Sequence, residues 1–194
     1  MHAYSVNLER RNRPIWALVL ISVTIASLQS AVFEDITKLW PALKSVLPSA
    51  SLIFFVLYLL FDKFFWKFGF VRFFFQINEP DISGEWQGNL KSSATDTESP
   101  MKVSIKQTWS KMGITSPFEH SNSSSFSAVF FADKSQPRFI YNYENIPHVR
   151  QSETMTRHIG TVELFLCADG TELIGTYFTS GERGTNGVIK LKKC

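Results

Sequence analysis

The sequence predicts an all-β domain, a small eight-stranded antiparallel β-barrel of lipocalin-like form, preceded by two transmembrane α-helices. Two long apolar stretches occupy the first third of the 194 residues. After Pro80 the apolar periodicity changes from helical to alternating, and eight short alternating segments separated by turn residues follow. These observations divide the chain into an N-terminal tail (1–14), a helical hairpin (15–76) and a barrel domain (77–194).

The first apolar stretch, residues 15–33, contains no charged residue. A hydrocarbon core of about 30 Å requires roughly 20 helical residues, so this stretch is long enough to cross a bilayer. A cleaved signal peptide is an alternative, because arginines precede the apolar run. The length of the run and the second stretch that follows it favour a membrane span.

The second apolar stretch, residues 42–61, contains a single charged residue, Lys44, near its outer end. A lysine in that position can extend its ammonium group to the membrane surface. A buried helix of a soluble domain is the alternative, but the stretch has no polar face to present to water. The sequence therefore predicts two spans joined by a short connector.

The charges that flank the two spans predict their orientation. Basic residues cluster before the first span and after the second, which places both termini in the cytoplasm. Phenylalanines interleave with the second cluster over residues 64–75, a composition suited to the lipid headgroup layer. A helix that continues and packs on the soluble domain is the alternative for this segment. The flanking basic residues are Arg10, Arg11, Arg13, Lys63, Lys67 and Arg72.

Small residues recur at four-residue spacing along the first span, at Ser22, Ala26 and Ser30. Small side chains on one helical face let two helix backbones approach closely. We expect this face to make a helix–helix contact, either within the hairpin or between chains.

Strict alternation marks the first strands of the barrel domain. Trp86 and Leu90 lie on one face of residues 84–91, and residues 101–109 alternate in the same way. Further strands are predicted at about 112–116, 122–132, 137–144, 158–167, 171–179 and 187–193.

Turn signals separate these segments. Asn145-Ile146-Pro147 predicts one turn, at the start of a longer polar connection over residues 145–157. Asp169-Gly170 predicts a type I′ hairpin turn between two well-patterned strands. Short connections between eight strands favour a closed antiparallel barrel, and a two-sheet sandwich is the alternative.

Motifs of catalysis and metal binding are missing from the sequence. The four histidines and two cysteines have no metal-ligand spacing, and neither a nucleophile elbow nor a phosphate-binding glycine loop occurs. The net charge of +3 is too small for binding a nucleic-acid polymer. We expect a protein that is not an enzyme and carries no cofactor or metal.

Aromatic and polar residues concentrate in two segments, FIYNYEN (139–145) and GTYFTSGERGTNG (175–187), with arginines in the loop between them. Tyrosine can stack on a nucleobase, Asn and Thr can bond its edge, and Arg suits phosphate. Strand tyrosines and a solvated turn are the ordinary explanation of the same pattern.

The ordered set of features resembles a known family. The two N-terminal spans, GEWQG, YNYEN followed by a proline, and GTYFT followed by Arg and Thr-Asn-Gly are similar to the two-transmembrane, β-strand-rich effectors of bacterial cyclic-oligonucleotide anti-phage signalling systems (CBASS). The resemblance covers essentially the whole chain.

The resemblance implies a sensor and an effector in one polypeptide. The barrel would bind a cyclic dinucleotide made by a partner nucleotidyltransferase, a CD-NTase, after infection. Binding would drive homo-oligomerisation, and the helices would then disrupt the bacterial inner membrane and kill the cell. Trp86 would belong to the barrel core. The expected ligand contacts are Tyr141, Tyr143, Asn145, Arg150, Arg157, Thr179, Arg183, Thr185 and Asn186.

Two other functions remain open at this point. One is a membrane-anchored lipocalin-type protein that carries an apolar small molecule in its barrel. The other is a structural module that acts only through its spans and its basic, aromatic juxtamembrane segment.

Overall fold

The computed structural model describes residues 1–6, 11–32, 49–93, 97–132, 136–149, 156–180 and 184–194. The chain forms two compact units, one of residues 9–77 and the other of residues 1–8 with 78–194. Each unit is described by itself below.

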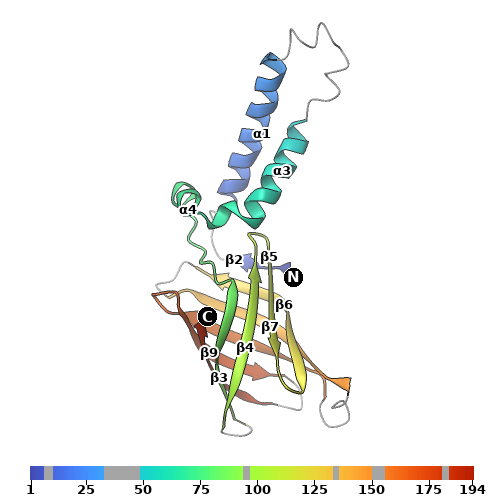
Figure 1. Cartoon of the computed structure of the whole chain (residues 1–194), viewed down its shortest axis with the longest axis vertical. Coiled ribbons are helices and arrows are strands. Elements are labelled where there is room, and N and C mark those ends of the chain that lie inside the picture. Colours follow the sequence, from blue (N-terminus) through green and yellow to red (C-terminus); the bar gives the residue numbers. More distant parts are fainter. Residues whose placement is uncertain (7–10, 33–48, 94–96, 133–135, 150–155, 181–183) are drawn as a thin grey trace. The chain divides into compact units, whose positions relative to one another are not determined.

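The helical unit contains α1 (Arg13–Val32), α3 (Ala50–Lys63), the 3₁₀ turn η2 (Phe65–Lys67) and α4 (Gly69–Phe75). Helices α1 and α3 lie side by side (Figure 1). Helix α3 begins at Ala50, and Ser49 caps its first turn. The Ser49 hydroxyl accepts a bond of 3.3 Å from the Leu52 amide.

Helix α1 covers the first predicted span and is long and apolar enough to cross a membrane by length and composition, and the span itself stays a prediction. The second span was predicted over residues 42–61, but the described helix α3 has only 14 residues. Fourteen helical residues extend about 21 Å, less than the roughly 30 Å of a hydrocarbon core. Residues 42–48 lie outside the described residues. Within the described part of the chain, α1 alone meets the criteria for a span.

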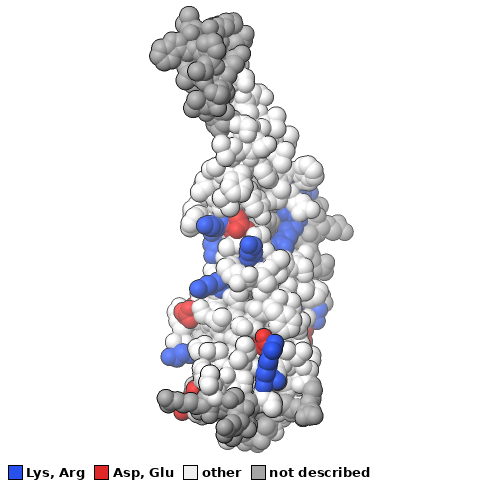
Figure 2. Space-filling view, turned by 90° about the vertical axis from the view of Figure 1, so that its right-hand side faces the viewer, with Lys and Arg blue, Asp and Glu red and all other residues white. Residues whose placement is uncertain are grey.

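Both long helices present apolar surface. The face visible in Figure 2 is white along residues 14–32 and 50–61, which contain no charged residue. Of the small residues on α1, Ser22 is buried, Ala26 is half-buried and Ser30 is exposed. The bulky apolar side chains exposed on these helices include Trp16, Leu20, Ile21, Val23, Leu28, Leu52, Phe55, Val56 and Leu59.

The second unit is a closed antiparallel β-barrel (Figure 1). Neighbouring strands pair in chain order from β3 to β10, and β10 pairs back to β3, which confirms a barrel rather than a two-sheet sandwich. The eight strands are β3 (Gly84–Ser92), β4 (Glu98–Gln107), β5 (Lys111–Pro117), β6 (Ser121–Phe131), β7 (Arg138–Pro147), β8 (His158–Leu166), β9 (Glu172–Thr179) and β10 (Asn186–Lys193).

One end of the barrel is filled by large side chains. Trp86, completely buried, donates from Nε1 to the Ile82 carbonyl at 2.9 Å. Trp109 and Met112 are also buried at this end. The prediction that Trp86 belongs to the core is confirmed. We call this the closed end, and the opposite end, where β7 and β9 finish, the mouth.

Two turn predictions were wrong in detail. Residues 145–147 continue β7 because they pair with Ser121–Ser123 of β6, so the loop begins only at His148. The Asp169-Gly170 hairpin connects the predicted strands, but only Gly170 has positive φ (+72°), whereas a type I′ turn needs positive φ at both central residues. The Gly170 amide instead bonds the Cys167 carbonyl at 2.9 Å, around a wider loop.

The N-terminal residues, predicted to be a tail, form two short strands of the barrel unit. Strand β1 (His2–Ala3) pairs antiparallel with β5, and β2 (Ser5–Val6) pairs parallel with β6. Two-residue strands carry no periodicity that a sequence pattern could reveal.

Candidate ligand-binding site

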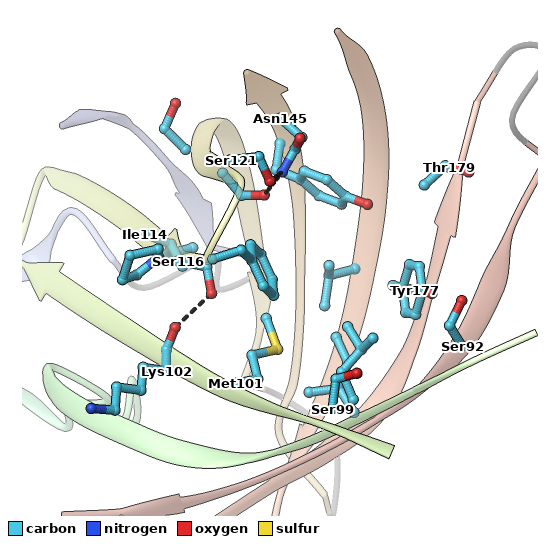
Figure 3. Close-up of a pocket in the computed structure, with 18 of the residues that line it drawn as sticks. Ser92, Ser99, Met101, Lys102, Ile114, Ser116, Ser121, Asn145, Tyr177 and Thr179 are labelled. Carbon is cyan, nitrogen blue, oxygen red and sulfur yellow. Dashed lines mark hydrogen bonds between the residues drawn. The ribbon is translucent and has the colours of Figure 1, made fainter. Parts of the chain in front are cut away.

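A cavity of about 620 Å³ opens inside the barrel toward the mouth (Figure 3). This volume lies within the range of about 300–1,000 Å³ typical of small-molecule sites. Its deeper wall is apolar, with Met101, Ile114, Val162 and Ile189, and its outer wall carries hydroxyl, amide and imidazole groups. The cavity therefore suits a ligand that has both flat apolar faces and polar edges.

Three tyrosines line the cavity from two strands. Tyr141 and Tyr143 point inward from β7 because alternate residues of a strand share a face, and Tyr177 points inward from β9. Tyr143 pairs with Gly160 and Tyr177 pairs with Gly187 on neighbouring strands. A Cβ at either glycine would lie within 2.7 Å of the tyrosine ring, so the missing side chains make room for the rings.

Asn145, 5% exposed, presents an acceptor with no protein partner among the described residues. Its Nδ2 donates to the hydroxyl oxygens of Ser121 (3.0 Å) and Ser123 (2.8 Å) on β6, which fixes the amide (Figure 3). Its Oδ1 is buried and accepts no hydrogen bond from any residue that the structure describes. A buried acceptor without a partner costs stability, and a donor on a bound ligand would satisfy it.

Thr179 and Thr185 face each other where β9 ends and β10 is about to begin. The Thr179 hydroxyl lies 3.0 Å from the Thr185 hydroxyl and accepts from the Thr185 amide at 2.9 Å. This pair fixes the base of the 180–185 loop and adds two hydroxyl groups to the cavity wall.

The structure brings together five of the nine residues expected from the sequence: Tyr141, Tyr143, Asn145, Thr179 and Thr185. Arg157 is outside the cavity, where it forms an exposed ion pair with Glu144. Asn186 does not line the cavity, and its backbone N–H donates to the Ser93 hydroxyl oxygen. Arg150 and Arg183 lie outside the described residues.

Sequence reasoning missed the serine-rich wall and the two imidazoles. Ser121, Ser123 and Ser125 point inward from β6, and His120 and His158 lie at the mouth. The stretch SNSSS (121–125) is entirely polar, so it has no apolar alternation that would indicate an inward face. Its signal is a run of hydroxyls inside a predicted strand, which indicates a polar cavity wall rather than a packed core.

Lys102, His120 and His158 are the cationic or imidazole groups among the described lining residues. Most of the other polar groups of the wall are neutral hydroxyl, phenol and amide groups, a set that can bond the edges of bases and sugars. The described residues contain no group of three or more His, Cys, Asp or Glu placed to hold a metal ion.

Burial raises the pKa of Tyr141, with a smaller contribution from the neighbouring Tyr143. The native chain therefore keeps a proton that the unfolded chain loses above its ordinary pKa of about 10. We expect the free energy of unfolding to fall above pH 10, by up to about 1.4 kcal/mol per pH unit for this group.

Urea unfolding of the full chain in detergent at pH 8 to 11 measures this dependence. Tyr141→Phe should flatten the fall above pH 10, because the phenylalanine has no proton to lose. Identical slopes in the wild type and the variant would contradict the assignment to Tyr141.

Comparison with known proteins assigns the barrel. Residues 77–193 match the family described as "Cap15, cyclic dinucleotide receptor domain". The chain belongs to the Cap15 family. CD-NTase-associated protein 15 of Yersinia aleksiciae is 32% identical over 157 residues, which are 79% of this chain and 73% of that protein. The resemblance to CBASS effectors is thereby confirmed, and the Cap15 domain is a cyclic dinucleotide sensor.

Proposed function

We propose that this chain is a CBASS effector whose barrel binds a cyclic dinucleotide from a partner CD-NTase and whose helices then disrupt the bacterial inner membrane. The observation that carries the proposal is the tyrosine-lined cavity with the buried, unpartnered Asn145 Oδ1, inside a Cap15-family barrel. The effector acts by binding and assembly rather than by catalysis.

The site residues have complementary roles in this proposal. Tyr143 and Tyr177 stack on the bases, and Asn145 Oδ1 accepts from a base N–H or amino group. Thr179 and Thr185 bond the sugar or phosphate edges. Arg150 and Arg183 are proposed as the phosphate partners, because planar guanidinium groups bind phosphate oxygens in pairs.

The membrane step is proposed from the apolar surface of the helical unit. Residues 15–33 and 42–61 form two spans with both termini in the cytoplasm, and the phenylalanines of residues 64–75 lie in the headgroup layer. Phe70, Phe73 and Phe74 are 79%, 86% and 69% exposed, which suits lipid contact better than water.

Damage requires several copies, because one two-helix hairpin cannot enclose a pore. Confinement to a membrane raises the effective concentration of the barrels, so a modest preference of the ligand for the assembled state is sufficient. The small-residue face of α1, with Ser22, Ala26 and Ser30, is a candidate for the contacts between helices.

The full chain in vesicles of phosphatidylethanolamine and phosphatidylglycerol tests the proposal. We expect one of cyclic di-AMP, cyclic di-GMP or cyclic GMP–AMP to raise the melting temperature and to release a trapped dye. Val23→Arg, in the middle of α1, should keep binding but lose dye release, because a central arginine costs about 2.5–3.5 kcal/mol on insertion.

Val23→Leu is the matched control and should release dye as the wild type does. Flat melting curves against a wider panel of cyclic nucleotides would contradict the proposal. Stabilisation by the apolar probe N-phenyl-1-naphthylamine alone would favour the lipocalin-type carrier instead.

A further inference from the structure

The barrel has one weak seam, between β5 and β6. These strands pair directly only at Thr115–Pro117 with Asn122–Ser124, the shortest of the eight pairings that close the barrel. Beyond Ser124 the register of β6 against β7 shifts between Ser125 and Ser127. Such a bulge bends a strand, and here β5 and β6 separate toward the closed end.

The N-terminal strands fill this gap. His2 and Ala3 pair with Met112 and Lys111 of β5. On the other side, Ser5 and Val6 pair with Val129 and Phe130 of β6. The segment thereby supplies backbone partners to two strand edges that lack each other.

The same seam is a wall of the cavity. Ile114, Ser116, Ser123 and Ser125 all line the cavity, and all lie on β5 or β6. The Ser125 hydroxyl accepts from the Ile114 amide at 2.9 Å and lies 2.8 Å from Nε2 of His2. One hydroxyl thus touches the cavity, the seam and the N-terminal strand.

A buried polar cluster ties this strand to the segment that follows α4. The hydroxyl of Tyr4 donates toward Glu79 and the Thr108 carbonyl, each at 3.2 Å. Gln107, at the end of β4, lies 3.4 Å from the Tyr4 hydroxyl, donates to the Pro80 carbonyl at 3.2 Å and accepts from the Ile82 amide at 3.0 Å. Both chain segments that continue into the helical unit are therefore bonded to one group on β4.

We propose that residues 2–6 are a strand latch that closes the β5–β6 seam and that a cyclic dinucleotide in the cavity releases. The inference rests on the proposed ligand site and adds the route by which occupancy reaches the helices. A ligand that contacts Ser123 and Ser125 can widen the barrel most easily at the β5–β6 seam, because the fewest backbone pairings must break there. Only six residues, 7–12, separate Val6 from the start of α1, so release of the latch frees the part of the chain that leads into that helix.

A reversible cross-link tests the latch in the full chain. Ala3 and Lys111 are exposed cross-strand partners, at a spacing that a disulfide can bridge. Ala3→Cys with Lys111→Cys, in a chain with Cys167→Ser and Cys194→Ser, locks the latch when oxidised. Asn89→Cys with Lys190→Cys is the matched control, because it joins exposed partners within the continuous β3–β10 ladder.

The probe is the panel of cyclic di-AMP, cyclic di-GMP and cyclic GMP–AMP, in vesicles. We expect the oxidised latch variant to bind nucleotide about tenfold or more weakly than its reduced form, because a ligand that releases the latch must bind the released state more tightly. At saturating nucleotide it should still lose dye release, and reduction should restore both affinity and release. The oxidised control should release dye normally. In the unlocked chain, nucleotide should speed hydrogen exchange of the residue 2–6 amides by about tenfold or more.

The outcomes separate the latch from the function on which it rests. Dye release from the oxidised latch variant, or residue 2–6 exchange that nucleotide leaves unchanged while dye is released, overturns the latch alone. Failure of every nucleotide to bind the unlocked chain overturns the ligand site, and with it the latch.

Discussion

Asn145→Asp should weaken cyclic dinucleotide binding by about 100-fold or more. The substitution keeps the shape of the side chain but places a carboxylate against a ligand with two negative phosphates. At an effective dielectric constant of about 20, two like charges roughly 5 Å apart repel by about 3 kcal/mol, which corresponds to about 100-fold in affinity. The hydroxyls of Ser121 and Ser123 can rotate to donate to the carboxylate, so the barrel should still fold.

Asn142→Asp is the matched control for this prediction. Asn142 lies three residues earlier on β7, faces away from the cavity and bonds Ser127 and Thr161. It should bind nucleotide as the wild type does. Isothermal titration of the full chain in detergent measures both affinities. An Asn145→Asp affinity within threefold of the wild type, or an equal loss in both variants, would remove Asn145 from the site.

Gly175→Ala should abolish the stable barrel. A Cβ at Gly175 would lie 1.8 Å from the Glu163 carbonyl oxygen and 2.8 Å from the Leu164 Cα on β8. Both obstacles are backbone atoms, so the strand itself must move and its pairing with β8 must break. A loss of about 4 kcal/mol or more in the free energy of unfolding is expected, with a fall in melting temperature of at least about 15 °C.

Gly69→Ala makes the same chemical change where nothing lies within 4 Å of the added Cβ. Its melting temperature should stay within about 2 °C of the wild type, because a surface change of this kind is worth under about 0.5 kcal/mol. Tryptophan fluorescence during heating follows the barrel through the buried Trp86. A Gly175→Ala chain that melts with the wild type would show that β8 and β9 are not so closely packed there.

The barrel strands could be predicted from the sequence because alternation of apolar and polar residues indicates which face of a strand is buried. Residues 101, 103 and 105 were predicted to share a face, and all three are buried in the core. Turn geometry was less predictable, because it depends on φ at single residues. Asn145-Ile146-Pro147 has the composition of a turn, yet pairing with β6 holds it in a strand.

The site could be predicted only in part, for a physical reason. Tyr141, Tyr143 and Thr179 lie at inward positions of their strands. The apolar residues beside them in the sequence indicate which positions of those strands face inward. Asn186 falls at the start of a strand, where one step in phase reverses the direction of a side chain. The inward serines of β6 sit before the bulge at residues 125–127, which changes which residues face the cavity.

The local sequence pattern alone could not predict the N-terminal strands or establish the second span. Residues 2–6 are ordered by the edges of β5 and β6, which are more than a hundred residues away in the chain. Residues 42–61 have the composition of a span, but a helix that starts at Ala50 is too short to be one by itself. The second span therefore stays a prediction.

The segments that lead to the helices, residues 1–6 and 78–83, attach at the closed end of the barrel, whereas the cavity opens at the mouth. Solute can therefore reach the tyrosines from the end of the barrel opposite to these two segments. A molecule that enters or leaves the cavity therefore need not pass between the two chain segments that continue into the helices.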